Sequence, residues 1–94
     1  MGLDELRRQI DSIDRKLVEL LNERGKLVEE VGRLKRRLAM DVYAPEREKE
    51  ILKLTKDASG GPFSGAAISR LFERILDESR SLERKIAEDF GGKT

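Results

Sequence analysis

The chain has 94 residues, enough for one domain. Charged residues make up 41% and aromatic residues only 4%, a balance typical of amphipathic helices, and the net charge of +1 predicts no general attraction to nucleic acid or to a membrane surface. The absence of cysteine and histidine excludes disulfides, the usual zinc sites and a histidine base. No apolar run approaches the roughly 20 residues of a membrane span and no signal peptide opens the chain, so we expect a soluble cytoplasmic protein.

The first expected element is one long helix over about residues 3–38. Its apolar residues recur at heptad-like spacing: Leu3, Leu6, Ile10, Ile13, Leu17, Leu20, Leu27, Val31, Leu34 and Leu38. A helix of this length is a rod of about 50 Å. Because a compact chain of similar size has a radius of gyration of only about 13 Å, the rod would leave its apolar stripe in water in a monomer. We therefore expect an intertwined, helix-swapped homodimer, with a plain coiled-coil dimer as the alternative.

Two shorter helices are expected after the first. Pro45 suits the first turn of a helix over about residues 45–56. The segment "DASGGPFSG" then breaks the chain, and Ser64 is placed to cap a third helix over about residues 64–90. The sequence thus predicts an all-α, single-domain chain of three helices, spanning residues 1–94.

Charged and polar residues occur on helix faces that should be buried. Arg24 and Lys35 are about 20° apart around the first helix and lie within its apolar stripe. Ser79 and Glu83 lie one turn apart on the apolar face of the third helix. The start of the second helix adds a guanidinium and a carboxylate, those of Arg47 and Glu48.

Two interpretations fit these inward-facing groups. A single buried arginine with a glutamate partner is commonly a structural ion pair, because unpaired buried charge is costly. Six such residues on three helices instead indicate a polar, cation-rich pocket whose remaining counter-ions arrive with a ligand. Guanidinium groups match carboxylates bidentately, so the pocket would suit a small dicarboxylate.

The sequence resembles the all-helical, AroQ-class chorismate mutases from Leu3 to about Ile86. The segments that carry the resemblance are "LRRQIDSIDRKLVELLNERGKLVEEVGRLK", "PEREKEIL" and "ISRLFERILDESRSLE". The loop "GGPF" also resembles versions associated with the first enzyme of the shikimate pathway, DAHP synthase, which suggests such a domain as a possible partner. The resemblance implies the Claisen rearrangement of chorismate to prephenate in phenylalanine and tyrosine biosynthesis, without cofactor or metal.

The resemblance also implies a set of substrate-contacting residues: Arg7, Arg24, Lys35, Arg47, Glu48, Ser79 and Glu83. Arg7 would reach one substrate carboxylate from the partner subunit, whereas Arg24 would hold another within its own chain. Lys35 and Glu83 would face the ether oxygen, and Glu48 would receive the substrate hydroxyl. Arg24, Lys35 and Glu83 are the expected catalytic residues.

Two positions depart from the family pattern. Ala44 stands where some members carry an aspartate near the substrate hydroxyl, and Glu83 stands where many carry glutamine. A glutamine donates a hydrogen bond at any pH, whereas a glutamate donates one only when it is protonated.

Two other functions fit the same sequence. The segment "APER" resembles the isochorismate pyruvate lyases, which share this fold and a similar cationic pocket. A weakly catalytic regulatory domain that binds a larger pathway enzyme is the second alternative. Assays with chorismate and isochorismate would separate these possibilities.

Overall fold

The computed structural model describes residues 2–91, and the side chains of residues 2–88. It contains three helices, α1 (Leu3–Arg37), α2 (Pro45–Ala58) and α3 (Gly65–Gly91), and no strand within the described residues. The expected all-α, three-helix chain is therefore confirmed, with helix bounds that differ from the predicted ones by one or two residues.

Local signals explain where the helices begin and end. α1 ends in a Schellman motif: the Met40 amide donates to the carbonyl of Lys35, and the Ala39 amide donates to that of Arg36. Ala39 adopts the left-handed conformation that this motif requires, with φ at 54°. Pro45 occupies the first turn of α2, and the Ser64 hydroxyl accepts a hydrogen bond of 3.1 Å from the Ala67 amide at the start of α3.

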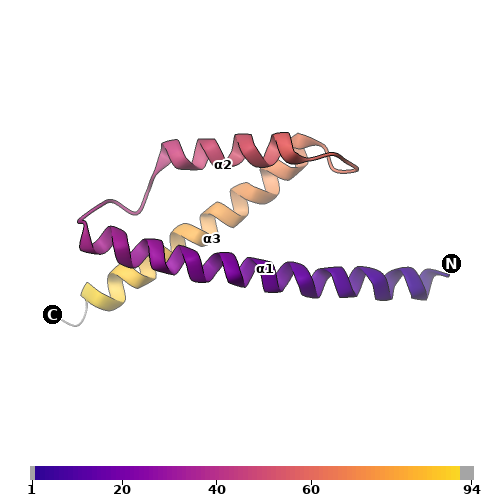
Figure 1. The fold of residues 1–94 in the computed structure, drawn as a ribbon, viewed down its shortest axis with the longest axis horizontal. Coiled ribbons are helices and arrows are strands. Elements are labelled where there is room, and N and C mark those ends of the chain that lie inside the picture. The colour runs from indigo at the N-terminus through magenta and orange to yellow at the C-terminus, as the bar shows by residue number, and fades with distance from the viewer. Residues whose placement is uncertain (1, 92–94) are drawn as a thin grey trace.

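α3 holds the chain together. It crosses behind the other two helices in Figure 1 and packs against both α1 and α2, whereas α1 and α2 make no direct backbone approach within the described residues. The face of α3 between them carries Leu76, which is only 5% exposed. The three helices together enclose a cavity, with α1 and α2 on its sides and α3 at its base.

Glycines allow α1 and α3 to lie close together. Gly32 is buried, and a Cβ atom there would lie 3.4 Å from the Cα of Glu83. A Cβ at Gly25 would lie 3.6 Å from Cδ1 of Leu82. Since both positions admit no more than a methyl group without displacing α3, these glycines set the depth at which α1 packs.

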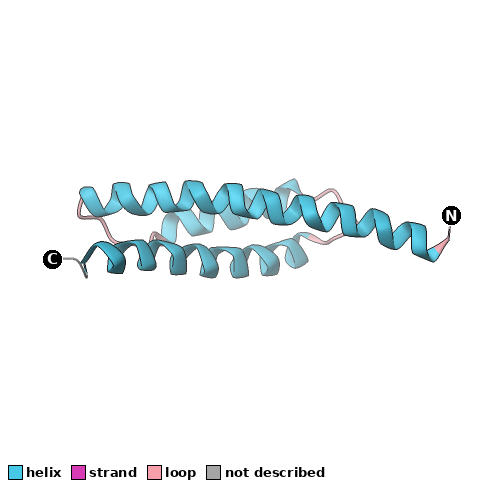
Figure 2. Ribbon diagram, turned by 90° about the horizontal axis from the view of Figure 1, so that it is seen from below, coloured by secondary structure: helices cyan, strands magenta, loops and turns pink. Residues whose placement is uncertain are grey.

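The N-terminal end of α1 extends beyond the other two helices (Figures 1 and 2). Large apolar side chains along it are about half exposed, at values between 44% and 62%: Leu3, Leu6, Ile10, Ile13, Leu17, Leu20 and Leu21. The radius of gyration is 16.7 Å, against about 13 Å for a compact chain of this size. The chain by itself therefore leaves an apolar stripe in water, and the expected dimer stays a prediction. Within the described residues, no helix has an apolar stretch that could cross a bilayer.

Candidate active site

A cavity of about 370 Å³ opens between α1 and α2 and is floored by α3. Its wall combines aliphatic and charged side chains from all three helices and from the segment that joins α1 to α2. The lining residues are Arg24, Leu27, Val28, Val31, Lys35, Val42, Ala44, Arg47, Glu48, Ile51, Leu76, Ser79, Arg80 and Glu83. Six of the seven residues predicted from the sequence are thus brought together around one cavity.

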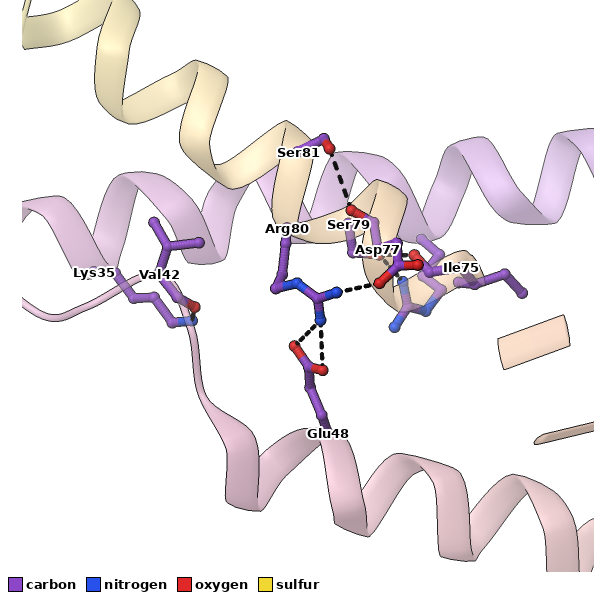
Figure 3. A network of polar contacts seen from close by, with 9 residues as sticks. Lys35, Val42, Glu48, Ile75, Asp77, Ser79, Arg80 and Ser81 are labelled. Carbon is purple, nitrogen blue, oxygen red and sulfur yellow. Dashed lines mark hydrogen bonds and ion pairs between the residues drawn. The ribbon is translucent and has the colours of Figure 1, made fainter. Parts of the chain in front are cut away.

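Lys35 and Glu83 face each other across the α1–α3 contact. The Lys35 ammonium lies 2.9 Å from Oε1 of Glu83, and the two side chains are only 15% and 10% exposed. The same ammonium donates a hydrogen bond of 2.8 Å to the carbonyl of Val42 (Figure 3). Its approach to Glu83 is an ion pair without hydrogen-bond alignment, so the buried Oε1 accepts no hydrogen bond within the described residues. The Lys35 ammonium is thus held at the cavity wall between the carbonyl of Val42 and the carboxylate of Glu83.

Arg24 is fixed by a residue of α3. Its Nη1 donates a hydrogen bond of 2.6 Å to the hydroxyl of Ser79, which donates in turn to the carbonyl of Ile75 at 2.7 Å. Because Ser79 is a neutral partner, the positive charge of Arg24 remains available to an anion in the cavity.

The first turn of α2 contributes the remaining predicted groups. Arg47 lies at the exposed rim, where its Nη1 pairs with the carboxylate of Glu50. Glu48 is more deeply placed, with 20% of its side chain exposed. Ala44 lines the cavity immediately before α2 and offers no side-chain polar group, so the polar contact expected of an aspartate at this position is missing.

Arg80 was not predicted from the sequence, yet it lines the cavity from α3. Its Nη1 donates to both oxygens of Glu48, at 2.6 and 2.8 Å, and its Nη2 pairs with Asp77 (Figure 3). The hydrogen bond to Glu48 is the main cause that raises the pKa of Arg80 above its ordinary value. The signal for this residue was its spacing, because Arg80 lies one turn after the buried Leu76 and three residues before Glu83.

Arg7 is the predicted residue that the chain does not bring to the cavity. It is exposed near the start of α1, and the 17-residue separation from Arg24 corresponds to about 26 Å along the helix. Arg7 could therefore serve such a cavity only in another copy of the chain.

The cavity carries an excess of positive charge. Arginines 24, 47 and 80 and Lys35 supply four cations, against two carboxylates from Glu48 and Glu83. In the part of the chain that the structure describes, no group of three acidic side chains is placed to hold a metal ion. The geometry thus matches a small ligand with two negative charges, held by fixed cations between aliphatic walls.

Comparison with known proteins identifies the family that has this fold and site. Residues 6–84 match the family described as chorismate mutase type II, and the chain belongs to that family. A chorismate mutase structure from Thermus thermophilus superimposes with a TM-score of 0.85 at 39% identity, covering 87% of this chain and 93% of that one. A Helicobacter pylori chorismate mutase in complex with prephenate gives a TM-score of 0.83 at 26% identity, covering 92% and 93% of the two chains.

A curated relative corrects one expectation about partners. A bifunctional chorismate mutase/prephenate dehydratase of Aquifex aeolicus is 41% identical over 88 residues, which are 89% of this chain and 24% of that protein. The chain thus spans about a quarter of the length of such curated relatives. Their second activity is prephenate dehydratase, so the expected association with DAHP synthase is not supported. That expectation came from the "GGPF" loop, and a short Gly-Pro turn recurs in unrelated chains for conformational reasons.

Proposed function

We propose that the chain catalyses the rearrangement of chorismate to prephenate. The observation that carries this proposal is the cavity of about 370 Å³ with four cations and two carboxylates, since chorismate is a small dianion. The family membership supports the same reaction.

The chemistry requires no nucleophile, because a C–O bond breaks and a C–C bond forms within one molecule. The protein has to hold the substrate in a compact conformer and to stabilise negative charge that develops on the ether oxygen. We assign the carboxylates of the substrate to Arg24, Arg47 and Lys35, and the ether oxygen to Lys35 and Glu83. The position of Lys35 suits both roles, because its ammonium lies at the cavity wall between Val42 and Glu83.

Glu83 would act as a neutral donor in this scheme. Because its Oε1 lies 2.9 Å from the Lys35 ammonium, the proton that it donates to the ether oxygen would be carried by Oε2. Glu48 would accept the substrate hydroxyl, and Ser79 would orient Arg24.

The active form in this proposal is a homodimer. A second copy would cover the exposed stripe of α1 and would bring its Arg7 to the cavity, as predicted from the sequence. The half-exposed apolar side chains from Leu3 to Leu21 support this arrangement, because burying them against a like surface removes apolar area from water.

The test is turnover by the purified chain. Chorismate disappearance and prephenate formation are followed together, beside a parallel incubation with isochorismate that would release salicylate and pyruvate. Arg24→Met should lower kcat/KM by at least 100-fold, because one fixed cation in a dry site contributes a few kcal/mol. Arg33→Met is the matched control, since Arg33 is exposed on α1 and does not line the cavity. A chain that leaves chorismate unchanged, or that uses isochorismate instead, contradicts the proposal.

A further inference from the structure

Arg80 joins three parts of the chain at the cavity. From α3 its guanidinium bonds to both carboxylate oxygens of Glu48 on α2 and pairs with Asp77 on its own helix. The ring of Tyr43, in the segment before α2, lies 5.7 Å from its Cζ atom. Figure 3 shows the guanidinium placed between the two carboxylates.

The contact between Arg80 and Glu48 matters for ligand binding because Glu48 lines the cavity. Its carboxylate shares the cavity with the cations Arg24, Lys35 and Arg47. A carboxylate that is free to rotate in such a cavity would pair with one of them and compete with an anionic ligand. Arg80 occupies one acceptor site on each oxygen of Glu48, and a carboxylate offers about four such sites. Glu48 can therefore be held by Arg80 and still accept a hydrogen bond from a ligand.

We propose that Arg80 is a positioning residue for ligand recognition: it orients Glu48 toward the hydroxyl of the substrate and keeps that carboxylate from pairing with the substrate-binding cations. This inference rests on the proposed function, because it assigns the group that Glu48 receives. A purely structural role would be different. In that case the contact would only tie α2 to α3, and its loss would lower the thermal midpoint while leaving the KM of the folded enzyme unchanged.

The experiment is a double-mutant cycle on kcat and KM for chorismate. It compares wild type, Arg80→Met, Glu48→Gln and the double variant, with helicity and thermal midpoint recorded for each. Arg80→Met keeps the aliphatic stem and should lower kcat/KM by about 10- to 100-fold, mainly through KM, the size expected for a lost charge-assisted hydrogen bond. In the Glu48→Gln background the same substitution should change kcat/KM by less than about twofold, because the carboxylate that Arg80 orients is absent.

A second set of variants distinguishes a loss of ligand recognition from a loss of folding. Arg80→Lys keeps the charge but cannot span two carboxylates, so the same cycle run with lysine should show a smaller loss that again vanishes in Glu48→Gln. Arg74→Met is the matched control, since Arg74 forms an exposed ion pair with Glu78 on the same helix, and it should leave kcat/KM unchanged.

Three outcomes would overturn the inference. If the losses of Arg80→Met and Glu48→Gln multiply, Arg80 does not act through Glu48. If Arg80→Met behaves like Arg74→Met, Arg80 has no part in recognition. If wild type itself leaves chorismate unchanged, the proposed function fails and this inference fails with it, an outcome that the wild-type assay separates from the other two.

Discussion

Lys35 and Arg24 carry the two positive charges that α1 turns toward the cavity, and each meets a polar side chain of α3. Lys35 lies 2.9 Å from a carboxylate oxygen of Glu83, and Arg24 donates to the hydroxyl of Ser79. The sequence predicts that the counter-ions of both residues arrive with the ligand. For Arg24, whose partner Ser79 is neutral, this stays a prediction, whereas Lys35 already has a carboxylate partner in its own chain. Removing Lys35 therefore leaves a largely buried anion without its cation.

Replacing Lys35 by methionine separates catalysis from stability. Lys35→Met should lower kcat by at least 100-fold, because the ether oxygen loses a cation. It should also reduce the free energy of unfolding by roughly 1–3 kcal/mol, because Glu83 loses its partner. The double variant Lys35→Met/Glu83→Gln should recover the stability but not the activity. Denaturant unfolding and steady-state kinetics on both proteins measure the two effects, and a fully active Lys35→Met would make this lysine purely structural.

Glu83→Gln tests the polar group that faces the ether oxygen. An ionised carboxylate repels the negative charge that develops on that oxygen, whereas an amide donates a hydrogen bond to it. Glu83→Gln should therefore raise kcat/KM or leave it unchanged, as measured by steady-state kinetics at one fixed pH. A loss of more than about tenfold would mean that Glu83 does not serve the ether oxygen as a neutral donor.

Helical periodicity placed four of the seven predicted site residues, because it states which residues share a face, whereas Arg47 and Glu48 were placed by their position at the start of the second helix. Arg24 and Lys35 follow the stripe of α1, and Ser79 and Glu83 follow that of α3. Arg80 was missed although its spacing from Leu76 and Glu83 was a signal, because a long side chain at the edge of a helix face can extend either into a cavity or into water. Its partner Glu48 lies 32 residues away on another helix, so the pair depends on how α2 packs against α3.

At the scale of the elements, the helices and their order were predictable, whereas the exact end of α1 was not. Pro45 and Ser64 are sequence signals with a local cause, a proline that suits the first turn and a hydroxyl that caps it. The end of α1 carries no glycine, although Ala39 takes the left-handed conformation of a Schellman motif. A residue with a Cβ atom is strained in this conformation and is uncommon there, so the local sequence did not predict the turn.

That strain predicts a stabilising substitution. Ala39→Gly should raise the free energy of unfolding by about 0.5–1 kcal/mol, because the relief of Cβ strain exceeds the added flexibility of the unfolded chain. The matched control is Ala66→Gly, at an exposed position within α3, which should lower stability by up to about 1 kcal/mol. Thermal unfolding of the three proteins measures both changes, and an Ala39→Gly protein that melts like the control would contradict the strain argument.

At the scale of the whole molecule, the chain is extended and its core is small. It measures 59 × 27 × 14 Å, and the apolar side chains of the first half of α1 stay about half exposed. The proposed second copy would bury this stripe and complete the cavity with Arg7, which is about 26 Å from Arg24 along α1. The dimer was predicted from the length of the first helix and from its apolar stripe, but the way in which two copies would pair depends on contacts between chains that no local pattern specifies.

Mixing two inactive variants tests the shared site. Arg7→Ala and Arg24→Ala should each lose most activity, since each removes a cation proposed to bind a substrate carboxylate. In a mixed dimer one cavity has its own Arg24 and receives an intact Arg7, while the other lacks both. After complete random exchange, half of the dimers are mixed and one of their two cavities is intact, so activity should return to about a quarter of wild type. Mixing Arg24→Ala with Arg47→Ala is the control and should restore nothing, because both residues line the cavity of their own chain. If Arg7→Ala with Arg24→Ala restores no activity despite exchange verified by mass spectrometry of tagged chains, Arg7 does not act across subunits. Recovery in the control would mean that Arg24 and Arg47 do not serve the same cavity.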